Sequence, residues 1–416
     1  MSATDTSIAA STASELAGRR RGLIALCTTE ITSWGVLYYA FPVLAGTITA
    51  DTKWSTAGVM AAFSIGLAVS AAAGIPVGRL LDRHGPRPVM TAGSILGVVA
   101  VAGIALAPNV WWFIAAWALS GLAQACVFYK PAFAAITGWY GPDRVKALTA
   151  LTLVAGLSST IFAPVTATLA DHTDWRTTYL VLGTFLAAVT IPAHAKFLSV
   201  PWKPNSHKAS GDQPTHTGAR AVIRSAPFVL LTIVIMLATF ALFLATINLV
   251  PMLTEHGAST SFAAWVLGLC GAGQLLGRIG YARLTARTSV RTRTVAVFVA
   301  AAVALAATAL TTGQPVAVIL AAIVFGATRG VFTLLEATAV SDRWGTDGFG
   351  TLYGIYSAPS TVAMAATPFA GAVLAAWFGG NQPLFLVMAA VLVAAGIAAI
   401  WTIPSRRESS AATESS

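Results

Sequence analysis

The sequence predicts an all-α integral membrane protein with twelve transmembrane helices arranged as two pseudo-symmetric six-helix bundles. Mean hydropathy is +0.75. Of the 416 residues, 56% are hydrophobic and 10% are charged, a balance far outside that of soluble domains. Twelve apolar runs reach about 20 residues, the length that a helix needs to cross ~30 Å of hydrocarbon. A repeat between the two halves of the chain predicts the pair of bundles.

The predicted spans follow one another with short polar connections. They cover residues 23–47, 56–80, 88–107, 110–135, 147–170, 175–197, 225–253, 260–284, 292–312, 315–341, 350–377 and 382–403. Ser, Thr and Ala dominate residues 1–21, which predicts a disordered tail without the apolar core of a signal peptide. Residues 405–416 are expected to form a second disordered tail.

The distribution of basic residues predicts the orientation. With a cytoplasmic N-terminus, only Lys53 and Arg176 fall in outside loops, while Lys130, Arg278 and Arg329 fall inside spans. Most of the 25 Lys and Arg then face the cytoplasm, as the positive-inside rule requires. We therefore expect a multi-pass cell-membrane protein with both termini cytoplasmic. The net charge of +10 reflects this topology, and no nucleic-acid partner is expected.

The two halves match at a constant offset of 204 residues. This offset aligns Leu80 with Leu284, Arg83 with Arg287, Asp143 with Asp347, Leu148 with Leu352 and Pro164 with Pro368. Parallel six-helix repeats are typical of one large class of secondary transporters, which bind substrate near the midplane between the halves. A polar cytoplasmic linker, 199–224, is expected to join an N-terminal bundle, 22–198, to a C-terminal bundle, 225–404.

The stretch GRLLDRHGPR, residues 78–87, fills the loop between the second and third spans. Gly78 permits close helix packing, Gly85 permits a tight turn, and Asp82 can accept hydrogen bonds from a helix N-terminus or from Arg83. The pattern resembles the signature loop of the major facilitator superfamily, Gly-x-Leu-x-Asp-Arg-x-Gly-x-Arg. The resemblance implies that this loop, with Arg87, latches the two halves in the outward-open state; a positive-inside loop without a gating role is the alternative.

A second resemblance concerns the monocarboxylate-transporter-like branch of that superfamily, which includes oxalate/formate-type exchangers. The matching positions are Pro131, Trp139, Tyr140, Arg144, Ala147, Gly156, Pro164, Trp175, Arg176, Tyr179 and the run Tyr39–Pro42. The resemblance covers residues 22 to 404 and implies that spans 1, 4, 7 and 10 line a central cavity. Val43 and Gln274 stand where animal members of the branch carry Lys and Asp. The resemblance therefore does not imply that this chain performs the proton-coupled lactate transport of those members.

A charged side chain at the bilayer centre costs roughly 2.5–3.5 kcal/mol, so such residues are functional candidates. Five stand out within the predicted spans: Glu30, Lys130, Arg278, Arg329 and Glu336. The branch resemblance implies that Arg278 holds a substrate carboxylate; snorkelling to the interface is the alternative. Arg329 is too deep to snorkel, so it binds substrate or forms a structural ion pair. Glu336, two turns further along, could pair with Arg329 through water or with Lys130.

The remaining candidates are less specific. Glu336, rather than Gln274, is expected to carry any coupled proton, while Glu30 and Lys130 handle substrate or protons, act in gating, or snorkel. Gln124, Asn248 and Gln274 could bond substrate or a neighbouring helix. Tyr38 and Tyr39 line the cavity or pack in the core. The run GAGQLLG, 271–277, lies inside a span and is assigned to helix packing.

Together these features predict a secondary transporter that alternates access and carries a small organic anion, a monocarboxylate, by proton symport or anion exchange. A proton-coupled multidrug or metabolite efflux pump is the main alternative, and a non-transporting membrane sensor is a third. The sequence has no HExxH, Walker-type or GxSxG motif, so neither an enzyme activity nor a cofactor or metal is expected. The expected partners are a small-molecule substrate and the lipid bilayer around a monomer.

Overall fold

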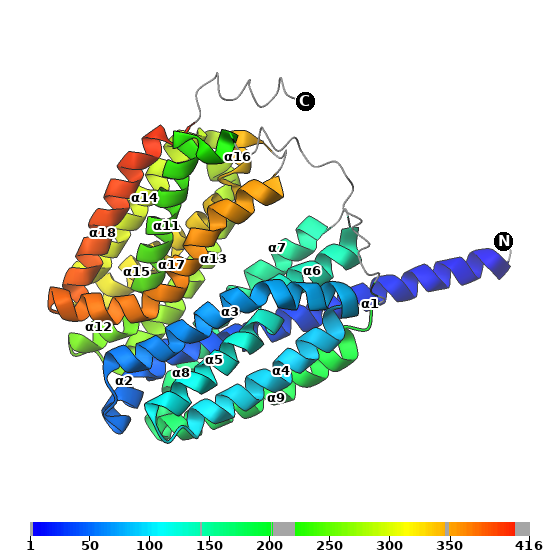
Figure 1. Ribbon diagram of the computed structural model, residues 1–416, viewed down its shortest axis with the longest axis horizontal. Helices are drawn as coiled ribbons and strands as arrows, with labels where there is room; N and C mark the ends of the chain where they lie inside the picture. Colours follow the sequence, from blue (N-terminus) through cyan, green and yellow to red (C-terminus); the bar gives the residue numbers. More distant parts are fainter. Residues whose placement is uncertain (1–2, 142–143, 201, 203–220, 346–348, 404–416) are drawn as a thin grey trace. The chain divides into compact units, whose positions relative to one another are not determined.

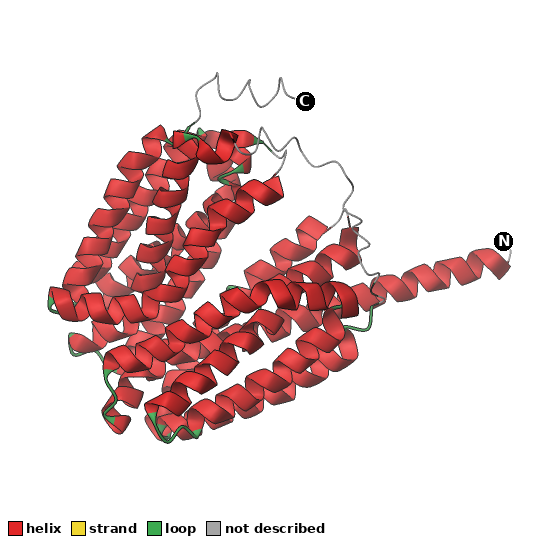
Figure 2. Ribbon diagram, viewed as in Figure 1, coloured by secondary structure: helices red, strands yellow, loops and turns green. Residues whose placement is uncertain are grey.

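The computed structural model describes residues 3–141, 144–200, 202, 221–345 and 349–403 (Figure 1). Every regular element among these residues is a helix, and Figure 2 shows no strand in them. The chain divides into two compact units, Met1–Ser206 and His207–Ser416. The predicted all-α class is confirmed.

The first unit is built from long helices joined by short turns. Its elements are α1 (Ala3–Trp34), the π-helix η1 (Gly35–Tyr39), α2 (Ala40–Thr52), α3 (Thr56–His84), α4 (Pro86–Ala105), α5 (Val110–Val127), α6 (Tyr129–Tyr140), α7 (Arg144–Ala155), α8 (Ser158–His172) and α9 (Trp175–Phe197). Polar N-caps begin three of them: the side chains of Ser55, Asn109 and Asp174 accept from backbone N–H groups of α3, α5 and α9. The hydrogen bonds from Thr177 hold the pKa of Asp174 below its usual value.

The second unit has the same construction. Its elements are α11 (Ala226–Ile247), α12 (Leu249–Glu255), α13 (Thr260–Arg287), α14 (Val290–Leu310), α15 (Pro315–Thr338), α16 (Ser341–Trp344), α17 (Phe349–Phe378), α18 (Asn381–Ala398) and the 3₁₀ turn η3 (Ala399–Trp401). Ser259 and Ser289 cap α13 and α14. Helices α3 and α13 start 204 residues apart, as do α4 and α14, which is the offset found in the sequence.

Twelve helices in the described residues are long and apolar enough to cross a membrane, which confirms the predicted number. The first span begins earlier than predicted, at Leu16, and α1 begins at Ala3. The helix therefore extends into the segment 1–21 for which the sequence predicts disorder. The run IAASTASELA within that segment is rich in alanine, the residue with the highest helix propensity, which favours continuation of the helix.

Four spans that the sequence outlines as continuous are interrupted, and one of them is span 5, which breaks at Gly156 and Leu157 between α7 and α8. Span 1 passes through the π-helix η1, span 4 breaks at the extended residue Phe128 (φ −82°, ψ −172°), and span 7 breaks at Asn248 between α11 and α12. The interruptions of spans 1, 4 and 7 each end three residues before a proline: Tyr39 before Pro42, Phe128 before Pro131 and Asn248 before Pro251. Proline lacks the N–H that would bond the carbonyl four residues back, so the helix loses a bond at each of these points.

Glycines bring the helices of each unit into close contact. A Cβ added to Gly121 on α5 would overlap the carbonyl oxygen of Gly66 on α3. In the second unit, a Cβ on Gly277 of α13 would overlap the oxygen of Ala327 on α15, and one on Gly326 would overlap the oxygen of Cys270. The assignment of GAGQLLG to helix packing is confirmed, because small residues let membrane helices approach backbone to backbone.

This packing predicts opposite effects for two glycines of α13. Gly277→Ala should lower the melting temperature of the purified protein and cost about 1–3 kcal/mol, because the added methyl must push α15 away. Gly280→Ala meets no atom within 4 Å and should be neutral or stabilise by about 0.5–1 kcal/mol through helix propensity. Equal melting temperatures for the two variants would contradict the close approach of α13 and α15.

Candidate functional site

The clearest candidate lies in the second unit, at Arg329 on α15. The side chain is 5% exposed, and its Cζ lies 4.4 Å from the centre of the Phe243 ring on α11. The buried Nε and Nη1 atoms of the guanidinium have no hydrogen-bond partner. No carboxylate in the described part of the chain pairs with Arg329, so the direct ion pair with Glu336 that the sequence allows is not formed.

Two other buried arginines of this unit show what a structural role looks like. Arg293 forms an ion pair with Asp342, with 2.5 Å between Nη2 and Oδ2. Arg343 donates to Thr402 and Thr294 through its guanidinium. Each of these guanidinium groups is bonded to oxygen atoms of the protein, although the Nε of Arg293 is also unpaired. Arg329 differs because it forms no ion pair among the described residues, contacts an aromatic ring and leaves two donors unpaired. The ring stabilises the charge by about 0.5–2 kcal/mol but accepts no hydrogen bond in the guanidinium plane.

The other candidate residues of the second unit lie on α13, on α15 and at the break between α11 and α12. Arg278 is half-buried on α13, the helix that packs against α15. Glu336 is half-buried two turns beyond Arg329 on the same helix, α15, and Tyr356 of α17 donates to its backbone oxygen (3.2 Å). The amide of Asn248 bonds its own helix, where Nδ2 donates to the Leu244 oxygen (2.9 Å) at the break before α12.

Gln274 is a packing position as well as a polar one. A Cβ built on Gly330 of α15 would overlap its backbone oxygen, and the residue is 6% exposed. Asn248 is similarly close to a glycine, since a Cβ on Gly371 would overlap Nδ2. The helix-packing alternative therefore accounts for both residues, and a substrate contact is not needed to explain them.

The first unit contains a second candidate, centred on Glu30. This side chain on α1 is fully buried, and its Oε2 accepts a hydrogen bond of 2.9 Å from the indole of Trp34. Its other oxygen, Oε1, is buried without a partner. Trp34 in turn stacks on Phe128, with 4.1 Å between ring centres and an interplanar angle of 12°. The carboxyl group thus lies beside the interruptions of both span 1 and span 4.

Two neighbouring candidates, Gln124 and Tyr38, make contacts within the first unit at these interruptions. Gln124 on α5 is fully buried, and its Nε2 donates to the oxygen of Leu37 in η1 (3.2 Å). Tyr38 is buried and Tyr39 half-buried, with 5.1 Å between their ring centres. Because π-helical turns displace backbone bonding partners, a side-chain donor from α5 compensates at Leu37. Gln124 and Tyr38 therefore have structural contacts in addition to any contact with a ligand.

Lys130 differs from the other charged candidates because it is exposed. It is the second residue of α6, directly after the break at Phe128. Its Nζ lies over α3, where a Cβ built on Gly74 would come within 3.0 Å of it. Lys130 therefore forms no buried ion pair within the described part of the first unit.

The loop with the signature pattern forms a tight turn. Gly85 has φ +78°, ends α3 and precedes Pro86 at the start of α4, so the predicted need for glycine there is confirmed. Two other expectations for this loop, close packing at Gly78 and a bond from the start of α4 to Asp82, are not seen within the first unit. A Cβ on Gly78 would meet no atom within 4 Å, and no side chain caps α4. The side chains of Asp82, Arg83 and Arg87 are exposed.

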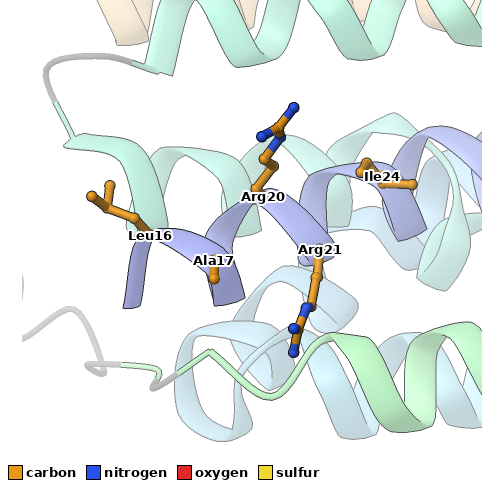
Figure 3. A pocket seen from close by; sticks show the side chains of 5 residues that line it. All are labelled: Leu16, Ala17, Arg20, Arg21 and Ile24. Atoms are coloured by element: carbon orange, nitrogen blue, oxygen red, sulfur yellow. The ribbon is translucent and has the colours of Figure 1, made fainter. Parts of the chain in front are cut away.

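A surface pocket on α1 is separate from all of these residues. It is lined by Leu16, Ala17, Arg20, Arg21 and Ile24. Figure 3 shows that the side chains of Arg20 and Arg21 point away from each other, so the two guanidinium groups do not converge on one ligand. No group of three metal-ligating side chains occurs in the part of the chain that the structure describes.

Comparisons with known proteins agree with this architecture. The family model described as Major Facilitator Superfamily matches residues 26–356, and a second match covers 233–416. Monocarboxylate transporter 13 of Bos taurus is 27% identical over 253 residues, which are 59% of this chain and 55% of that protein. Multidrug resistance protein MdtL of Shigella flexneri is 30% identical over 211 residues, 50% of this chain and 51% of that protein. The match thus spans about half the length of each of these relatives.

A solved structure shows the same fold over nearly the whole chain. The nucleoside transporter NupG superposes with a TM-score of 0.70 at 14% identity, and the match covers 92% of this chain and 98% of that one. At this identity the similarity concerns the arrangement of helices and says nothing of the cargo.

The exposed carboxylate of the loop provides a test of its predicted latch role. Asp82→Asn should shift the population toward the inward-open state and slow turnover several-fold without lowering the melting temperature, because an exposed side chain contributes little to folding. Labelling of single cysteines at the two cavity mouths measures the shift. Unchanged labelling together with normal transport would leave this loop with a topological role alone.

Proposed function

The chain belongs to the Major Facilitator Superfamily of secondary transporters, and from this premise we propose that its cargo is a small organic anion, a monocarboxylate. Alternating access between two bundles then moves the anion across the cell membrane. The basic residues outside the spans support cytoplasmic termini. The carrier works as a proton symporter or an anion exchanger and needs no cofactor.

The observation that carries this proposal is the incompletely bonded guanidinium of Arg329. Two donors, Nε and Nη1, are buried without partners. An unpartnered donor on a charged group costs more than the ~1–3 kcal/mol of a neutral one, so the site is stable only if a ligand or water completes it. A carboxylate matches a guanidinium because its two oxygens accept two parallel N–H bonds in one plane. The name of one relative, monocarboxylate transporter 13, fits this chemistry.

An amphipathic drug is the alternative cargo, supported by a different observation. The rings around the two interruptions of the first unit form a continuous aromatic cluster of Trp34, Tyr38, Tyr39, Phe128 and Tyr129. Such a surface suits flat or cationic compounds, and one relative is named for multidrug resistance. The negative faces of these rings attract cations and do not attract anions. The binding affinity should therefore depend on Arg329 for an anionic cargo and should be independent of it for a lipophilic cation.

Arg329→Lys separates the two cargo classes. Lys keeps the charge but loses the paired planar donors, so the affinity for a carboxylate should fall roughly 10- to 150-fold, the equivalent of ~1.5–3 kcal/mol. Thermal stabilisation of purified protein by acetate, pyruvate and benzoate measures this affinity. Arg278→Lys tested in the same way shows whether the second arginine shares the contact.

Arg283→Lys is the matched control, because Arg283 is exposed on the same helix as Arg278. It should leave all three affinities unchanged. The proposal is wrong if no carboxylate stabilises the wild type while tetraphenylphosphonium does, since that result indicates a lipophilic cation as cargo.

For proton coupling, the buried geometry favours Glu30 over the Glu336 that sequence reasoning selects. Glu30 is fully buried and has one unpartnered oxygen, while Glu336 is half-buried. Ionising a carboxyl group in a dry interior costs several kcal/mol unless a proton or cation accompanies it. We propose that Glu30 takes up a proton in one state of the cycle and releases it in another.

The pair Glu30→Gln and Glu336→Gln tests this assignment. The amide oxygen introduced by Glu30→Gln can still accept the bond from Trp34, so this variant should abolish accumulation driven by a pH gradient in proteoliposomes yet preserve exchange of labelled pyruvate or benzoate. Glu336→Gln should retain both activities. If accumulation is lost only in Glu336→Gln, the proton travels through the second unit, as the sequence alone suggests.

A further inference from the structure

Trp202 is the one residue between 201 and 220 that the structure describes, and it contacts the rest of the first unit at three points. The indole Nε1 donates to the backbone oxygen of Asp82 at 3.3 Å. A Cβ on Gly85 would lie 2.9 Å from Cγ of the indole, and a Cβ on Gly138 would lie 2.8 Å from Cζ3. The five-membered ring thus faces Gly85 and the six-membered ring faces Gly138, two glycines that belong to separate segments of the unit.

Each of the two glycines leaves space that any other residue would fill. Gly85 is also required by its φ of +78°, so its contact with Trp202 adds a second constraint at the same position. Gly138 lies within α6 and has no positive φ. In an exposed helix, glycine is less favourable than alanine by roughly 0.5–1 kcal/mol. The position of the indole supplies the reason for glycine at residue 138.

The hydrogen bond meets a need of helix α3. The last carbonyl groups of a helix have no intrahelical partner. The Leu81 oxygen accepts from Gly85 N–H in the turn (2.7 Å), whereas the Asp82 oxygen receives the indole N–H. Trp202 therefore completes the end of α3 at the residue that begins the exposed charged part of the signature loop.

We propose that Gly85 and Gly138 form a docking slot for Trp202, which fastens the connection between the two units to the signature loop and positions that loop. The indole joins the turn between α3 and α4 to the last turns of α6. Through Asp82 and Gly85 it holds the segment that presents Asp82, Arg83 and Arg87. Trp202 is a positioning residue, because it acts on the backbone of the loop, and the inference does not depend on the cargo.

The test measures how accessible the loop is with and without the docked indole. A reporter, His84→Cys, is placed at an exposed position of the loop, in a chain whose Cys27, Cys126 and Cys270 are replaced by alanine. Trp202→Ala should raise the rate of maleimide labelling roughly 5- to 10-fold, as expected when one hydrogen bond and an aromatic contact are lost. Trp202→Phe keeps a ring and loses the N–H, so its rate should be intermediate.

The slot itself is tested by a double-mutant cycle. Gly138→Ala should raise labelling when Trp202 is present, because the methyl displaces the indole, and should have no further effect in the Trp202→Ala background. Gly46→Ala is the matched control: Gly46 lies on α2 with nothing within 4 Å of a built Cβ, so labelling should not change in either background.

A second reporter separates local from global effects. Lys53→Cys lies at the other end of the unit, between α2 and α3, and is exposed. Its labelling rate and the melting temperature should stay at wild-type values in all variants. The inference is overturned if Trp202→Ala leaves the His84→Cys rate unchanged, if Gly138→Ala acts equally in both backgrounds, or if both reporters rise together.

Discussion

Polar groups inside these helices have to find partners within the protein, and most of the structure follows from that constraint. Hydroxyl groups bond the preceding turn of their own helix, as Thr246 does with Leu242 and Thr308 with Ala304. Both ring nitrogens of the buried His194 bond hydroxyl groups, those of Ser94 and Thr29. Some buried polar atoms nevertheless lack a partner, such as the hydroxyl of Ser33 and the indole N–H of Trp117. The unpaired atoms of Arg329 and Glu30 differ from these because they belong to charged groups, for which a missing bond costs more.

The same constraint explains the different roles of the prolines, which interrupt helices, and of the glycines, which allow helices to pack closely. Prolines remove backbone donors, and they do so in spans 1, 4 and 7, where the helices are interrupted beside aromatic rings and polar side chains. Glycines allow backbones to approach closely and hold the helix pairs α3 with α5 and α13 with α15 together. These closely packed pairs contrast with the interrupted spans, and broken helices of that kind form the substrate sites of many secondary transporters.

The two units carry different chemistry on related scaffolds. The first contains the buried carboxyl group, the aromatic cluster and the docked Trp202, and the second contains the guanidinium stacked on Phe243. Helices α3 and α4 recur 204 residues later as α13 and α14, so the two units share a backbone repeat while their buried charged and aromatic side chains differ. Fold similarity to a nucleoside transporter is consistent with this division, because a shared helix arrangement does not determine cargo.

The sequence by itself determined the number and nearly all the bounds of the spans, because hydrophobic length and proline, glycine and charge placement are local properties. It also singled out Arg329, Glu30 and the turn at Gly85. Only the tertiary structure decided which charges have partners: Arg293 meets Asp342, whereas Arg329 meets the ring of Phe243, and no local pattern distinguishes the two. The role of Trp202 also depends on the tertiary structure, since two glycines distant in sequence, Gly85 and Gly138, make its slot. The burial of a side chain and the identity of its bonding partners are decided only when separate helices pack.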